Sequence, residues 1–200
     1  MTSVQPITDS SETKPGRENY FGPGQRDMWY FILFDSFVFS CYLISYVIFR
    51  AKNPAEFLAS QAHMGQGFGI FNTVLLLTSS WFLARCVRYT RNNQLGRARR
   101  YLMLTAAIGV SFMVSKSIEW SLAIKSGFTL TYSLYFSFYY FITGFHMVHM
   151  VCGLVALSYI YYNLRNPTDH VLYSVETGAT YWHMVDLLWV YIFALLYLMR

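Results

Sequence analysis

Charged side chains are scarce in this sequence. Asp, Glu, Lys and Arg supply 12% of its 200 residues, whereas a soluble domain usually carries about 25%. Most of these residues stand in short segments between long apolar runs, so the shortage indicates a membrane domain. The net charge of +5 does not indicate nucleic-acid binding, because the basic residues flank apolar spans and form no contiguous basic face. Contact with anionic lipid headgroups is the alternative interpretation of that charge.

Several motifs are missing altogether. The chain has no P-loop, Rossmann, GxSxG or HExxH motif. Its cysteines show no CxxC spacing and lie in apolar spans, which favours buried free thiols at Cys41, Cys86 and Cys152. No internal repeat is found, which argues against an inverted-repeat transporter. The apolar runs are too long for membrane β-strands and lack their alternation.

Five apolar stretches are long enough to cross a ~30 Å hydrocarbon core as helices, which takes about 20 residues each. They cover residues 28–49, 68–89, 101–124, 134–162 and 180–199. The predicted fold class is all-α: a polytopic membrane protein in which residues 28–200 form one bundle of five transmembrane helices. Residues 1–27 are polar and have no apolar core near Met1, which predicts a flexible tail and no cleavable signal peptide.

The distribution of Lys and Arg predicts the orientation. Ten of the 15 basic residues fall on the N-terminal side of the membrane, and six of those ten lie close together between the second and third spans: Arg85, Arg88, Arg91, Arg97, Arg99 and Arg100. Four fall on the other side. The positive-inside rule then places the N-terminus in the cytoplasm and the C-terminus outside a cell (plasma) membrane.

Ionisable residues inside the spans need an explanation, because each costs roughly 2.5–3.5 kcal/mol at mid-membrane depth. Asp35, in the first span, is either a protonated acid hydrogen-bonded within the bundle or a carboxylate that handles protons or faces a partner. Lys116 and Glu119 are three residues apart on the third span, so they share a helix face and can neutralise each other.

Three histidines raise the question of a metal. His146 and His149 share one face of the fourth span, and His183 lies three residues before Asp186 on the fifth. Hydrogen bonding across helices is the favoured interpretation, because a membrane di-iron site needs more His and Glu ligands than these scattered groups supply. A stand-alone membrane metalloenzyme that uses the three histidines is the alternative from a different class.

Two long segments resemble a known family. Residues 143–149 (TGFHMVH), followed by Gly153, are similar to the TGFHxxH…G signature of haem-copper oxidase subunit III. Residues 176–189 (ETGATYWHMVDLLW) are similar to its ExxxxYWHFVDxxW segment, with Met184 in place of Phe. Weaker similarity extends to residues 116–120 (KSIEW), to the pair Asn72 and Thr73 with Ser79 beyond, and to Asp35, where the family usually has a buried Glu.

The resemblance implies a non-catalytic, all-helical subunit that packs against the catalytic subunit carrying haem and copper. It implies no cofactor in this chain, possible phospholipid binding, and support of proton uptake and of sustained turnover. The residues that it marks for a proton or partner role include Glu176, which opens the second motif, beside those named above. The chain begins at the third helix of seven-helix members, like the five-helix subunits of quinol oxidases.

The complex that this subunit serves is left open by the sequence. Residues 34–39 and 71–81 resemble a branch of the family associated with nitric oxide reductases. An accessory subunit of a nitric oxide reductase is therefore the alternative to an accessory subunit of a terminal respiratory oxidase.

Overall fold

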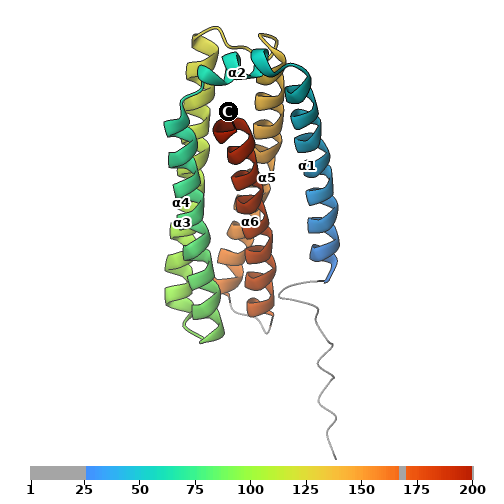
Figure 1. The fold of residues 1–200 in the computed structure, drawn as a ribbon. Helices are drawn as coiled ribbons and strands as arrows, with labels where there is room; N and C mark the ends of the chain where they lie inside the picture. The colour runs from blue at the N-terminus through green and yellow to red at the C-terminus, as the bar shows by residue number, and fades with distance from the viewer. Residues whose placement is uncertain (1–25, 167–169, 200) are drawn as a thin grey trace, which may run out of the picture.

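A computed structural model describes residues 26–166 and 170–199, and within those residues the chain is helical, without strands. Five long apolar helices confirm the predicted all-α class. The elements are α1 Arg26–Lys52, α2 Pro54–Ala62, α3 Gln66–Arg91, α4 Leu95–Lys125, α5 Leu134–Arg165, α6 Val171–Phe193 and the π-helical turn η1 Ala194–Leu198 (Figure 1).

The long helices extend past the expected spans. The largest difference is at α6, which begins at Val171 and not near residue 180, because its polar first turns pack against neighbouring helices and need not be apolar. The nine-residue α2 was not expected, since it is too short to cross a membrane. The tail expected over residues 1–27 lies outside the described residues, apart from the start of α1.

Local sequence explains where the helices begin and end. Pro54 opens α2, a position where its missing N–H costs no hydrogen bond. Gly127, at φ +87°, follows α4, and the N–H of Phe128 bonds back to the carbonyl of Ala123 at 3.0 Å. Asn93, at φ +56°, has the same place after α3, and the N–H of Gln94 bonds back to the carbonyl of Tyr89 at 2.9 Å. Both ends are Schellman caps, which need a residue that tolerates the left-handed conformation.

The helices form an up-and-down bundle in which α6 is the most buried element and α1 the least. The turn between α3 and α4, the end of α5 and the start of α6 lie at the same end as the start of α1 (Figure 1). The short α2, the α4–α5 connection and the end of η1 lie at the opposite end. The two ends therefore differ strongly in charge, since the α3–α4 turn carries the clustered arginines.

Close packing around Trp182 holds α6 inside the bundle. A Cβ atom at Gly109 of α4 would lie 2.7 Å from the indole, and one at Gly153 of α5 would lie 2.9 Å from it. The indole N–H donates to Ser79 Oγ of α3 at 3.1 Å. One side chain thus contacts three other helices, and the two glycines make room for it.

Candidate functional site

A carboxyl–imidazole pair joins α1 to α5. Asp35 Oδ1 lies 3.0 Å from His149 Nε2, and both side chains are buried. The other imidazole nitrogen, Nδ1, lies 2.8 Å from the carbonyl oxygen of Phe145. The hydroxyl of Tyr181 on α6 donates to the carbonyl of His149 at 3.3 Å. Three helices thus meet at this pair. The sequence analysis considered Asp35 by itself and did not predict its contact with His149.

These contacts determine how protons are arranged on the pair. A carbonyl oxygen only accepts hydrogen bonds, so His149 Nδ1 must carry a proton. The remaining bond then holds one shared proton: either a protonated Asp35 donates to a neutral imidazole, or an imidazolium donates to the carboxylate. Asp35 Oδ2 has no hydrogen-bond partner among the described residues. In either arrangement one proton joins Asp35 to His149.

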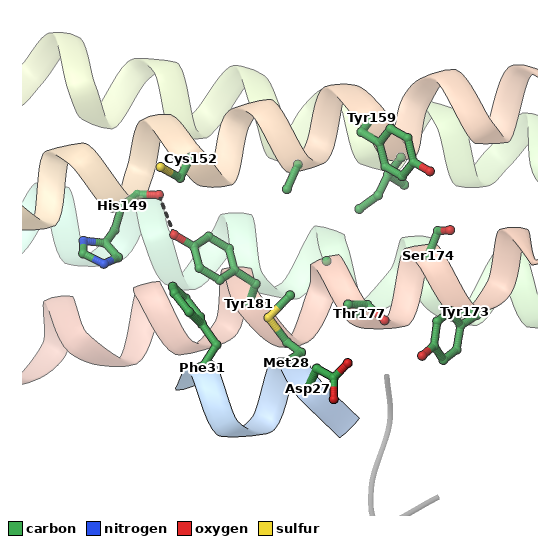
Figure 2. Close-up of a pocket in the computed structure, with 13 residues that line it drawn as sticks. Asp27, Met28, Phe31, His149, Cys152, Tyr159, Tyr173, Ser174, Thr177 and Tyr181 are labelled. Carbon is green, nitrogen blue, oxygen red and sulfur yellow. Dashed lines mark hydrogen bonds between the residues drawn. The ribbon is translucent and has the colours of Figure 1, made fainter. Parts of the chain in front are cut away.

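A cleft leads along the bundle to this pair. It has a volume of about 710 Å³, and it is lined by α1, α5 and α6 from Asp27 near the start of α1 to His149. Figure 2 shows Phe31 and Met28 on the α1 side, with Tyr173, Thr177 and Tyr181 along α6. Its walls are mostly apolar and its polar groups gather toward the Asp27 end, so one end of the cleft resembles a membrane interface and the other the membrane interior.

A second polar cluster surrounds Lys116. Its ammonium donates to Glu119 at 3.1 Å, to Tyr139 at 2.9 Å and to Tyr197 at 2.6 Å. Both phenols in turn donate to Glu119. All three ammonium protons are used, and Lys116 has no exposed surface. The expected pairing of Lys116 with Glu119 is confirmed, and the two tyrosines add to it.

The turn η1 is held by polar side chains from the other helices. Gln61 of α2 and Tyr135 of α5 both donate to the carbonyl of Leu196, at 3.0 and 2.9 Å. Tyr46 of α1 donates to the carbonyl of Leu195 at 3.3 Å. The carbonyl groups at this helix end therefore find partners inside the protein, as buried backbone groups require.

Three buried polar side chains near the middle of the bundle are not paired in this way. No hydrogen-bond partner is found among the described residues for either ring nitrogen of His146, for the amide nitrogen and oxygen of Asn72, or for either carboxyl oxygen of Asp186. The Ser80 hydroxyl lies next to Asp186, but it is bonded to Nδ1 of His183 at 2.5 Å. The prediction of interhelical hydrogen bonds thus holds for His149 and His183, whereas the described residues supply none to His146.

Glu176, like His183, is only partly buried, whereas the other predicted site residues are buried. Its carboxylate pairs with the guanidinium of Arg91 at 2.8 Å, which ties the first turns of α6 to the end of α3. The predicted buried ionisable groups that do face protein are Asp35, Lys116, Glu119, His146, His149 and Asp186, with His183 half-buried.

The histidines do not fit a shared metal site. His149 has both nitrogens engaged, His183 bonds to Ser80, and His146 contacts the rings of Phe112 and Trp189. Among the described residues, no group of three His, Cys, Asp or Glu side chains is arranged to hold a metal ion.

Nothing in the sequence distinguished Tyr139 and Tyr197, which complete the Lys116 cluster, from the other 15 tyrosines.

Comparison with known proteins gives a consistent result. Residues 27–200 match the family described as cytochrome c oxidase subunit III. A protein of Synechocystis sp. named cytochrome c oxidase subunit 3 is 29% identical over 174 residues, which are 84% of this chain and 72% of the relative. A cytochrome bo(3) ubiquinol oxidase subunit 3 of Buchnera aphidicola is 27% identical over 90% of this chain and 93% of the relative. A heme-copper oxidase subunit I+III of Aeropyrum pernix is 25% identical over 86% of this chain and 22% of the relative.

Proposed function

The chain belongs to the cytochrome c oxidase subunit III family, and from this premise we propose that it is the accessory subunit III of a haem-copper terminal oxidase in a respiratory chain. The observation that carries the proposal is the match over residues 27–200, which includes every long helix of the bundle. The chain is a multi-pass membrane protein, and its partner is the catalytic subunit of the oxidase.

The partner is supported by one of the relatives. The Aeropyrum pernix protein is named as subunits I and III together, and this chain corresponds to about a fifth of it. A single chain that carries both subunits indicates that they work side by side. The relatives described above are named as oxidases, so we propose oxygen, and not nitric oxide, as the substrate of the complex.

The geometry favours an accessory role over the metalloenzyme alternative. That alternative needs His146, His149 and His183 as one ligand set, and His149 uses both of its nitrogens in hydrogen bonds within the bundle. Haem and copper are therefore assigned to the catalytic subunit, and this chain contributes helix packing and buried polar groups.

The role in proton uptake is proposed from the Asp35–His149 pair. The cleft begins at Asp27, at the end of the bundle that carries the clustered arginines, and it ends at His149. We place this end on the cytoplasmic side of a cell membrane, because the positive-inside rule assigns clustered basic residues to that side. The pair at the inner end of this cleft would hold protons, and phospholipid in contact with the bundle would shield it from bulk water.

The test is purification through an affinity tag on this chain in a mild detergent. We expect the large catalytic subunit to co-purify, with the haem absorbance of the sample following that subunit when the two are separated. A chain that retains haem absorbance or about one metal ion by itself, and loses it on His149→Ala, would contradict the accessory role in favour of an enzyme.

A further inference from the structure

The turn between α3 and α4 gathers arginines at one end of the bundle. Six lie between Arg85 and Arg100. Within the described residues, only Arg91 forms an ion pair with a carboxylate, that of Glu176. The other five retain a full positive charge that no acidic side chain of the described residues neutralises. A negative group beyond the described residues is therefore favoured here on electrostatic grounds.

Two of these arginines lie over aromatic rings. The Arg85 guanidinium lies 5.1 Å from the centre of the Trp81 ring, and that of Arg97 lies 5.8 Å from the centre of the Tyr89 ring. Both distances fall within the range of cation–π attraction. Arg97 also donates to the side-chain oxygen of Gln94 at 3.1 Å.

The two aromatic rings that contact these arginines, Trp81 and Tyr89, belong to one continuous row of rings. Trp81 contacts Phe82 at 5.0 Å, Phe82 contacts Tyr101 of α4 at 5.9 Å, and Tyr101 stacks on Tyr89 at 5.1 Å. The row crosses from α3 to α4, which themselves pack closely along their length. It therefore holds an arginine at each end on a rigid support, so that less side-chain entropy is lost when a ligand is bound.

The surface beside the row is apolar and faces outward. Val74, Leu77 and Trp81 recur at helical spacing on α3, and each is more than half exposed. Arg85 and Arg88 continue the same stripe toward the turn. A stripe that changes from apolar to basic at the end of a membrane helix matches a lipid, whose acyl chains and headgroup change in the same order.

We propose that the α3–α4 turn is a binding site for the phosphate headgroup of an anionic phospholipid, held between Arg85 and Arg97 with its acyl chains along the exposed stripe of α3. Guanidinium groups bind phosphate oxygens through paired N–H donors, and the flanking rings set their position. This site is separate from the cleft at His149, and it rests on the membrane placement proposed above.

A lipid fits this surface better than an acidic segment of the partner protein. An acidic segment would need only the charges, whereas this surface joins the charges to an apolar stripe that continues toward the middle of the bundle. Trp81 serves both parts, since its ring supports Arg85 and its exposed face belongs to the stripe.

The experiment measures lipid retention in the intact complex. The complex is purified through this chain, stripped of loosely bound lipid, and titrated with phosphatidylglycerol or phosphatidylcholine, with bound lipid read by native mass spectrometry. We expect Arg85→Gln and Arg97→Gln each to weaken phosphatidylglycerol retention about five-fold and the double variant about 25-fold. Arg91→Gln is the matched control, because it removes the same charge from the same turn where Glu176 already neutralises it; less than a two-fold change is expected.

Four results would overturn the site. An equal loss with Arg91→Gln would indicate a diffuse charge effect, and equal retention of phosphatidylcholine would exclude headgroup recognition. Complete competition by millimolar inorganic phosphate would indicate a site for a soluble anion. If the double variant releases the catalytic subunit while its lipid retention is unchanged, the turn binds an acidic protein segment and the proposal is wrong. Failure of the complex to form with the wild-type chain would instead count against the function proposed above. Trp81→Leu keeps both charges and the apolar surface, and we expect it to weaken retention by removing the support of Arg85.

Discussion

At the scale of single residues, Asp35 and His149 share one hydrogen bond whose proton can reside on either partner. The amide of Asn can donate to a neutral imidazole just as a protonated carboxyl does, but it has no proton to transfer. The two roles of Asp35, in holding α1 and in handling a proton, can therefore be separated by the choice of substitution.

Asp35→Asn should assemble with the catalytic subunit like the wild type but lose activity during sustained turnover. Asp35→Ala should also reduce co-purification, because it leaves His149 Nε2 buried without a partner, at a cost of about 1–3 kcal/mol. Both variants should insert normally, since neither adds charge to the span. The measurements are the yield of the co-purified complex and oxygen consumption over many turnovers. Wild-type values for both variants in both assays would show that Asp35 only packs.

The Lys116 cluster makes a different prediction, because its charges are buried and mutually satisfied. Lys116→Met leaves the Glu119 charge without its cation, and Glu119→Met leaves the Lys116 charge; each should destabilise the chain by about 3–5 kcal/mol. The double variant removes both charges and should be less destabilised than either single variant. Thermal unfolding of the purified complex measures this, and additive effects of the two substitutions would contradict the pairing.

Residue-scale prediction from the sequence succeeded where the pattern itself limits the answer. A spacing of three on one helix was enough to pair Lys116 with Glu119. The bond between Asp35 and His149 could not be predicted from the sequence, because 114 residues separate them and only the packing of α1 against α5 brings them together. For His146, sequence reasoning expected a hydrogen-bond partner, and the structure places the ring against Phe112 and Trp189 instead.

At the scale of helices, the packing of the bundle depends on the positions where a helix backbone can come close to a side chain of a neighbouring helix. Gly109→Ala and Gly153→Ala each place a methyl group within 3 Å of Trp182, and should destabilise the chain by about 1–3 kcal/mol. Gly144→Ala is the control on the same helix as Gly153, since its new atom would lie 3.8 Å from Trp120, an ordinary contact. Thermal unfolding again provides the readout, and a loss with Gly144→Ala as large as that with Gly153→Ala would rule out close packing at Trp182 as the cause.

The elements show how far apolar runs predict a membrane fold. Five runs of sufficient length gave five long helices, because in hydrocarbon the backbone must satisfy its hydrogen bonds within each segment. The same criterion could not find α2, which has nine residues, nor the start of α6. Those first turns contain Glu176 and fell outside the expected span, although the charge of Glu176 is neutralised by Arg91.

At the scale of the whole molecule, the orientation can be tested at the two ends of α4. A cysteine at Gly96, where a Cβ atom meets nothing within 4 Å, should be protected from an impermeant thiol reagent added outside intact cells. A cysteine at Ser126, exposed at the opposite end, should be labelled. The parent chain, with Cys41, Cys86 and Cys152 intact, gives the background. Labelling of Gly96→Cys with protection of Ser126→Cys would reverse the proposed topology.

The central position of α6 has a consequence for how the protein is made. The helix that the others surround is translated after all of them, so on the order of seconds pass in which the nascent chain sits in the membrane without it. During that interval the Lys116 cluster lacks Tyr197, and Ser79 and Thr73 lack their tryptophan donors. The unfinished bundle is thus a natural substrate for membrane insertion factors and quality-control proteases. A chain that stops before Val171 should be degraded much faster than the full chain in a pulse-chase experiment.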